Sequence, residues 1–163
     1  MIAERSHADD SAKRDLEASI ELLPTGPAFF GLGNIARRAN QIDQAKEHYR
    51  VASSAGGDLG KAAQASLMRL DLGNNPEQYI QKRTGLDDQG QLLVEITNPT
   101  IVDVANIAVT IQYVSADGAT RTATRDLGGT LPAGQSARFA TGLGPFTATN
   151  QYRVTISGAA IAE

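Results

Sequence analysis

The chain of 163 residues contains no cysteine, which excludes disulfide bonds, thiolate metal sites and a cysteine nucleophile. This absence suits a reducing cytoplasm and a bacterial periplasm equally, so it leaves the compartment open. Aromatic residues make up only 5% of the chain, and glycine is common with 16 residues. We therefore expect a core of alanine, leucine, isoleucine and valine, interrupted by many turns.

A basic excess is also missing. The formal net charge is −3, and no stripe of lysine and arginine stands out in either half of the chain. A nucleic-acid-binding protein needs such a stripe to neutralise backbone phosphates. We therefore expect no nucleic-acid partner.

Long apolar runs are absent as well. No stretch approaches the roughly 18 continuous apolar residues of a membrane-spanning helix. The first residues, MIAERSHADDSAKRD, lack the positively charged start and the apolar run that form a signal peptide. We expect no signal peptide and no direct membrane insertion.

In the first half of the chain, apolar residues recur at intervals of three and four, which is the helical period. The interruptions LPTGP, NQ and SAGGDLG divide this half into segments. The final segment ends at Gly73, which is followed by Asn-Asn-Pro. The sequence predicts four helices, near residues 9–22, 27–39, 42–55 and 58–72.

After Tyr79 the apolar period changes to two, and β-branched residues dominate. Asp117-Gly118 is a strong hairpin signal, and LPAG has the proline and glycine positions of a β-turn. The segments with strand character give six or seven short strands: 80–86, QLLVEIT, NIAVTIQYV, 119–126, SARFAT and QYRVTIS. We expect an α+β chain of two domains, a helical one at residues 1–76 and an immunoglobulin-like antiparallel β-sandwich at residues 77–163.

Bulky and small residues alternate at fixed offsets in FFGLGNIARRANQIDQAKEHYRVA; the residues concerned are Phe29, Leu32, Gly33, Asn40, Ala45, Tyr49 and Ala52. This segment resembles a tetratricopeptide repeat, a helix–turn–helix unit of about 34 residues. Gly33 and Ala45 would let two antiparallel helices approach closely, with Tyr49 filling the space beside them. Ala36 stands where the pattern has an aromatic residue, and Gly57 where it has proline. An ordinary pair of helical hairpins is the alternative.

The remaining order of segments adds a second resemblance. Residues 9–22 look like the second helix of a repeat whose first helix is missing, and such arrays normally need about three units. The whole chain, ending in the β half with LPAGQSARFATGLGPF, resembles the C-terminal region of repeat-bearing, CAAX-protease-like bacterial zinc metallopeptidases. That resemblance implies a fragment located in the periplasm or cell envelope, although the cytoplasm is not excluded. It also places the chemistry in an N-terminal HExxH domain that this chain lacks.

Catalytic and metal-binding patterns are missing from the chain itself. A metallopeptidase site needs two histidines one helical turn apart, but the two histidines are His7 and His48. The adjacent carboxylates of Asp87 and Asp88 lie in a polar turn sequence. The glycine-rich runs lack the Lys-Ser/Thr of a phosphate-binding loop. We expect no enzyme activity in this chain, no metal and no cofactor.

The tetratricopeptide resemblance implies a groove lined by the first helix of each pair. It nominates six peptide-binding residues: Phe30, Asn34, Arg37, Arg38, Gln64 and Met68. Asn34 and Arg37 would bind the backbone or the terminal carboxylate of an extended peptide, because arginine presents a planar fork of donors. The carboxylate-clamp pattern of the family has lysine where this chain has Phe30. A solvated basic face is the alternative.

The β half offers one further candidate. Residues 119–126 are polar and are expected at a sheet edge, where an extended peptide adds a strand in some complexes. Arg121 and Arg125 favour the opposite role, protection of the edge against unwanted pairing.

The expected function is therefore a non-catalytic interaction or scaffolding region with a protein or peptide partner. A purely structural spacer without a ligand is the alternative.

Overall fold

The computed structural model describes the backbone of residues 2–162 and the side chains of residues 8–162. The chain divides into two compact units, Met1–Leu70 and Asp71–Glu163. The sequence-based boundary lies between residues 76 and 77. Within the second unit the carboxylate of Asp71 accepts hydrogen bonds from Asn75 Nδ2 and Tyr79 Oη, both at 2.9 Å, and the structural boundary accordingly precedes the predicted one.

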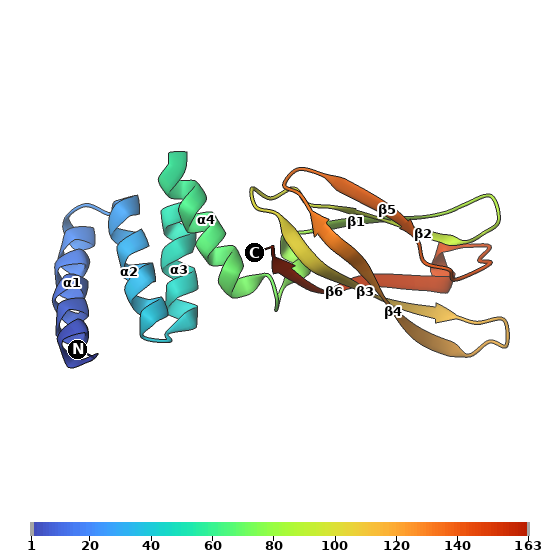
Figure 1. The fold of residues 1–163 in the computed structure, drawn as a ribbon, viewed down its shortest axis with the longest axis horizontal. Coiled ribbons are helices and arrows are strands. Elements are labelled where there is room, and N and C mark those ends of the chain that lie inside the picture. The colour runs from blue at the N-terminus through green and yellow to red at the C-terminus, as the bar shows by residue number, and fades with distance from the viewer. Residues whose placement is uncertain (1, 163) are drawn as a thin grey trace. The chain divides into compact units, whose positions relative to one another are not determined.

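The first unit is built from four helices (Figure 1): α1 (Ile2–Leu22), α2 (Gly26–Arg38), α3 (Ile42–Ser53) and α4 (Gly57–Asp71). The predicted number of helices is confirmed. A proline in the first turn of α2 suits the fixed backbone angle of that residue. Asn40 has a φ of 58° and makes the tight turn between α2 and α3. Helix α1 begins earlier than predicted. The prediction missed its first residues because they lack an apolar period.

The core of the helical unit lies where α2 meets α3. A Cβ atom on Gly33 would come within 2.7 Å of the Tyr49 ring, so these two residues are in direct contact. Tyr49 and Ala45 are fully buried, and Ala36 joins them in one cluster. The predicted close approach of the two helices at Gly33 is confirmed. Ala36, which departs from the repeat pattern, is also a core residue.

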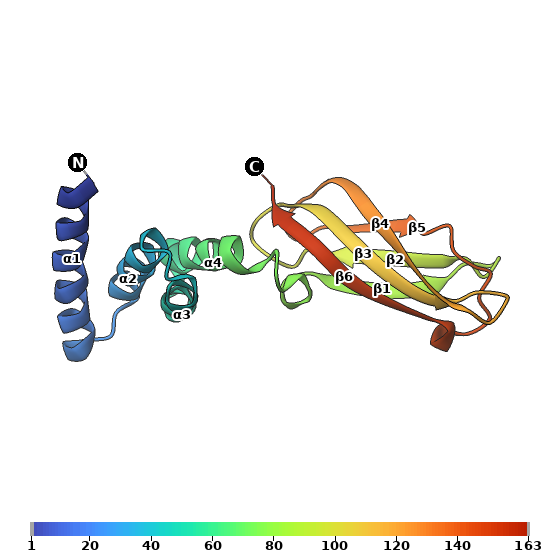
Figure 2. The same cartoon turned by 90° about the horizontal axis from the view of Figure 1, so that it is seen from below.

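The second unit contains six strands among its described residues: β1 (Gln81–Leu86), β2 (Leu92–Thr97), β3 (Val104–Val114), β4 (Thr120–Leu131), β5 (Ser136–Ala140) and β6 (Tyr152–Ile161). They form two antiparallel three-stranded sheets, ordered β1-β2-β5 and β4-β3-β6. Figure 2 shows β3 between β4 and β6. The prediction of an α+β chain with antiparallel strands is confirmed. Strand β4 runs past its predicted end because residues 127–131 continue to pair with β3.

Alternating burial along the central strands gives the β unit its core. In β2 the alternate residues Leu92, Val94 and Ile96 are fully buried. In β3 a bulge at Asn106, which has a φ of 53°, shifts the register between Ala105 and Ile107. Asn106 stands opposite both Gly128 and Gly129 of β4, and this break in the alternation lets both Val104 and Ile107 face the core.

A buried amide fixes the loop after β2. The Asn98 side chain is fully buried and donates from Nδ2 to Val102 O at 2.9 Å and to Leu131 O at 3.0 Å. Its Oδ1 accepts hydrogen bonds from the backbone N–H and the hydroxyl of Thr100. Every polar atom of this side chain is therefore paired, and the end of β2 is tied to the end of β4.

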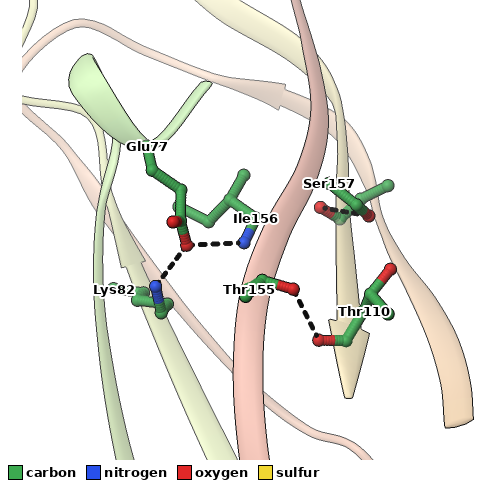
Figure 3. Close-up of polar contacts among 7 residues, drawn as sticks. Glu77, Lys82, Thr110, Thr155, Ile156 and Ser157 are labelled. Atoms are coloured by element: carbon green, nitrogen blue, oxygen red, sulfur yellow. Dashed lines mark hydrogen bonds and ion pairs between the residues drawn. The ribbon is translucent and has the colours of Figure 1, made fainter. Parts of the chain in front are cut away.

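A carboxylate covers part of the outer edge of β6 (Figure 3). Glu77, in a short 3-10 helix (Pro76–Gln78), accepts a hydrogen bond from the backbone N–H of Ile156 at 3.0 Å and pairs with Lys82. The hydrogen bond from Lys82, followed by that from Ile156, lowers the pKa of Glu77. On the other side of β6, Thr155 Oγ1 donates to Thr110 O at 3.3 Å. Glu77 thus occupies an edge amide that would otherwise be open to another strand.

We predict that Gly33→Val destabilises the helical unit by roughly 1–3 kcal/mol, because the new side chain must displace the buried Tyr49 ring. Thermal unfolding followed by circular dichroism at the helical band measures the effect. Gly85→Val is the matched control, since a Cβ atom at Gly85 meets no neighbour within 4 Å. Equal melting temperatures for Gly33→Val and wild type would contradict the tight contact.

A second prediction concerns the pH dependence of the contact between Glu77 and the Ile156 amide. Because folding lowers the pKa of Glu77, its ionised form stabilises the edge above the ordinary pKa range of glutamate, and this contribution disappears as the pH falls through the lowered pKa. Protection of the Ile156 amide against hydrogen exchange should therefore decrease between about pH 5 and pH 3 in the wild type. Glu77→Gln should show no such step, whereas the control Glu95→Gln should retain it. A wild-type amide without a pH step would refute the assignment.

Candidate functional site

A hollow of about 330 Å³ lies on the surface formed by α2 and α4, and its lining residues are Asn34, Arg37, Ser66, Arg69 and Leu70. Asn34 and Arg37 are three positions apart on α2. On α4, Arg69 and Leu70 follow Ser66 by three and four positions. Each set therefore occupies one face of its helix. Leu70 also packs against the buried cluster around Tyr49. The core contact between helices therefore positions the polar residues at the surface.

The amide of Asn34 is oriented from beneath by Tyr49. The Tyr49 hydroxyl donates to Asn34 Oδ1 at 2.8 Å, and the tyrosine itself is fully buried. A buried tyrosine hydroxyl needs a partner, and Asn34 provides it. Because Oδ1 accepts this bond, the two N–H groups of Nδ2 are the donors left for the hollow.

The hollow is electropositive. It is lined by the guanidinium groups of Arg37 and Arg69 and by no acidic residue. Neither arginine forms an ion pair with another side chain within residues 8–162. The Ser66 hydroxyl donates to Ala62 O at 2.9 Å, so only its lone pairs remain. Unpaired guanidinium groups beside an apolar Leu70 favour an anion with acceptor oxygens.

Arg38, one residue further on, has another role. Its Nε and Nη2 donate to Asp9 Oδ2 and Oδ1 at 3.0 and 2.7 Å, which joins α2 to α1. This hydrogen bond to Asp9 raises the pKa of Arg38. Arg38 does not line the hollow, and its fork of donors is used within the protein, because one residue step turns a helical side chain to a different face.

The other three nominated residues lie outside the lining of this hollow. Met68 is fully buried, so its assignment to a ligand-contacting surface is corrected to a core position. Phe30 is half-buried, with its ring centroid 5.7 Å from that of Tyr49, and packs against the cluster. Gln64 is exposed on α4. The structure brings together Asn34 and Arg37 from the predicted set.

Sequence reasoning missed Ser66 and Arg69. The face of α4 that meets α2 depends on the rotation of α4 about its own axis. The repeat pattern predicted other residues of α4 for this face. The burial pattern of α4 itself gives a signal, since Ala63 is fully buried and Leu67 and Leu70 pack on the core cluster. Ser66 and Arg69 lie beside that buried stripe.

Other candidate residues form no comparable site. His48 is half-buried beside the Phe29 ring, and burial lowers its pKa. The His7 side chain lies outside the described residues. Among the described residues no group of three or more histidine and acidic side chains is arranged to hold a metal ion. Within that same part, none of the helices has both the length and the apolar character needed to cross a bilayer.

At the edge of the second sheet, both arginines of β4 have local partners. Arg121 pairs with Asp117 at 2.7 Å, and Arg125 Nε donates to Thr141 O at 2.8 Å. Strand β4 is the outermost strand of its sheet. Arg125 therefore reaches from this edge to the segment that follows β5.

Comparisons with known proteins give little guidance. No family model and no curated protein matches the chain. A solved Pseudomonas fluorescens alkylpurine DNA glycosylase AlkC, bound to DNA with an abasic site analogue, is 16% identical over 82% of this chain, which spans 49% of the glycosylase chain. The Salmonella enterica trimeric lipoprotein SadB is 12% identical, with 98% of this chain and 85% of that chain covered. Both TM-scores are 0.32, and neither similarity supports an argument about this protein.

The different surroundings of two adjacent arginines generate a prediction. Arg38→Ala should lower the free energy of unfolding by about 0.5–1 kcal/mol, the upper range for a partly exposed ion pair, and added salt should reduce the difference. Arg37→Ala, its neighbour on the same helix, is the control and should leave stability unchanged. Urea unfolding at low and high salt measures both. A larger loss for Arg37→Ala would contradict these assignments.

Proposed function

We propose that the chain is a non-catalytic protein-interaction region whose helical unit binds an extended peptide by its carboxylate. The observation that supports this most directly is the hollow between α2 and α4. It presents the unpaired guanidinium groups of Arg37 and Arg69 together with an amide that Tyr49 orients. A carboxylate matches such a set because each of its oxygens accepts hydrogen bonds from planar donors.

The residues that precede the terminal carboxylate of a peptide would make further contacts outside the arginine pair. Gln64 is exposed on α4, and Leu70 gives the hollow an apolar wall. We propose that the terminal carboxylate lies between the two arginines and that the preceding residue contacts Leu70. The hollow contains no pair of nucleophile and general base, since the only hydroxyl in its lining, that of Ser66, donates to a backbone carbonyl. This lining suits binding rather than catalysis.

We further propose that the helical unit is a tetratricopeptide-type scaffold. The contact of Gly33 with Tyr49 and the buried Ala45 support this reading. For the β unit we propose an immunoglobulin-like sandwich. It is supported by alternating burial in the central strands and by two links between the sheets, from Arg125 to Thr141 and from Asn98 to Leu131.

The larger context is also a proposal. The order of a short helical array and a β domain supports placing this chain in the C-terminal region of a bacterial envelope zinc metallopeptidase, where it would position a partner or a substrate protein. An HExxH motif in the reading frame upstream of this chain would support that placement. A native start at Met1 would remove it. The alternative function is a structural spacer in which neither unit binds a ligand.

Peptide binding tests the leading proposal. A fluorescent pool of random short peptides with free carboxyl termini should bind the whole chain, as measured by fluorescence anisotropy. Arg37→Ala and Arg69→Ala should each weaken binding by roughly 10- to 100-fold, because a hydrogen-bonded charge pair contributes about 1.5–3 kcal/mol. Arg83→Ala, an exposed arginine of β1, is the matched control and should bind normally.

The same measurement separates the alternatives. Absence of binding by the wild type at millimolar peptide would favour the spacer. Binding that survives the double variant Arg37→Ala/Arg69→Ala would place the ligand on another surface.

A further inference from the structure

Tyr49 connects the helical core with the hollow. Its ring is fully buried against Gly33, while its hydroxyl reaches Asn34 Oδ1 at 2.8 Å. The ring contact and the hydrogen bond are separate functions of one side chain. Phenylalanine would preserve the first and remove the second.

The hydrogen bond determines which half of the Asn34 amide is available. An asparagine side chain has one carbonyl acceptor and one N–H₂ donor, and a free amide can present either. In this structure the acceptor Oδ1 is turned toward the hydroxyl of the fully buried Tyr49. The donor half therefore remains for the hollow, beside two arginines that can only donate.

We infer that Tyr49 is a positioning residue that sets the selectivity of the hollow for a carboxylate over the isosteric carboxamide. This inference rests on the proposed function, since it concerns the ligand of the same surface. A carboxylate offers acceptors to Asn34 Nδ2 and to both guanidinium groups. A carboxamide has one oxygen and an N–H₂ group, and that N–H₂ group meets the donor side of Asn34 while Tyr49 keeps Oδ1 turned toward the core.

Two other groups nearby bear on this selectivity. Ser66 Oγ donates its hydrogen to Ala62 O, so its lone pairs are an acceptor of the lining that Tyr49 does not orient. It lies on α4, whereas Asn34 lies on α2. A carboxamide can therefore use Ser66 only if its nitrogen faces α4. Tyr49 disfavours the opposite orientation, in which the nitrogen would face α2, because it turns Asn34 Oδ1 toward the core.

The test compares two peptides that differ only in the terminal group, a carboxylate or a carboxamide. Both are synthesised from one sequence that binds the whole chain. We expect the wild type to prefer the carboxylate by about 10-fold or more, because a desolvated N–H₂ group without an acceptor is unfavourable. In Tyr49→Phe the Asn34 amide is free to turn, so the preference should fall several-fold. A third peptide with an amidated end and an internal aspartate distinguishes a side-chain carboxylate from a terminal one.

Tyr113→Phe is the matched control, because it removes a tyrosine hydroxyl from β3 in the other unit. It should retain the wild-type preference. Asn34→Asp provides a second variant that leaves Tyr49 in place. Its carboxylate would still accept from Tyr49 and would repel the ligand, so the affinity for the carboxylate peptide should fall more than that for the carboxamide peptide.

A measurement without ligand checks the same hydrogen bond. The side-chain N–H₂ resonances of Asn34 in a ¹⁵N-labelled sample should differ between wild type and Tyr49→Phe, while cooperative unfolding is retained. A residue with a merely structural role would change stability but not the ratio of the two affinities.

The outcomes are distinguishable from those of the proposed function. If no peptide with a free carboxyl terminus binds the wild type, the proposed function and this inference both fail. If the wild type prefers the carboxylate and Tyr49→Phe keeps the same ratio, the peptide-binding function stands and the role of Tyr49 is refuted. A reduced ratio in Tyr49→Phe, with Tyr113→Phe unchanged, supports the inference.

Discussion

The helical unit depends on one contact, the Tyr49 ring lying directly on Gly33. Only glycine leaves room for an aromatic ring at this distance, and only an aromatic side chain of this length extends from the buried cluster to Asn34. The buried hydroxyl donates to Asn34 Oδ1 on α2. Packing and surface chemistry are thus linked through a single residue. A change made for tighter packing would also alter the polar surface above it.

The two kinds of apolar period in the sequence predicted the secondary structure well because burial follows the period of each element. The three- and four-residue intervals located α2 and α3 within about two residues. The burial in β2 and β3 follows the period of two, with Val94, Ile96 and Val109 fully buried. The apolar period gives no signal where strand pairing, rather than burial, defines the element. The glycine-containing end of β4 shows this, since it remains a strand only through its partner β3.

The hollow could be predicted from α2 and not from α4. Asn34 and Arg37 follow from one helix and its spacing. Arg69 becomes their neighbour only through the rotation of α4 about its axis, which depends on side-chain packing across the helices. The adjacent pair of Arg37 and Arg38 shows the same limit at smaller scale. Their residue type is identical, yet Arg38 has a partner in Asp9, which is 29 positions earlier in the chain. Sequence spacing alone does not assign such long-range partners.

The bulge at Asn106 has a consequence for how this protein can vary. Here Asn106 alone stands opposite Gly128 and Gly129 of β4, whereas Asn106 and Ile107 together stand opposite Ala159 of β6, so the two flanking pieces of β3 keep their own alignments with each neighbour. A strand shifted by a single position would exchange its buried and exposed sides. Asn106, with its left-handed backbone conformation, therefore fixes the register of β3 against its neighbours. An insertion or deletion in the hairpin after Val114 leaves this register unchanged. An insertion or deletion inside β3 would need a compensating change at Asn106.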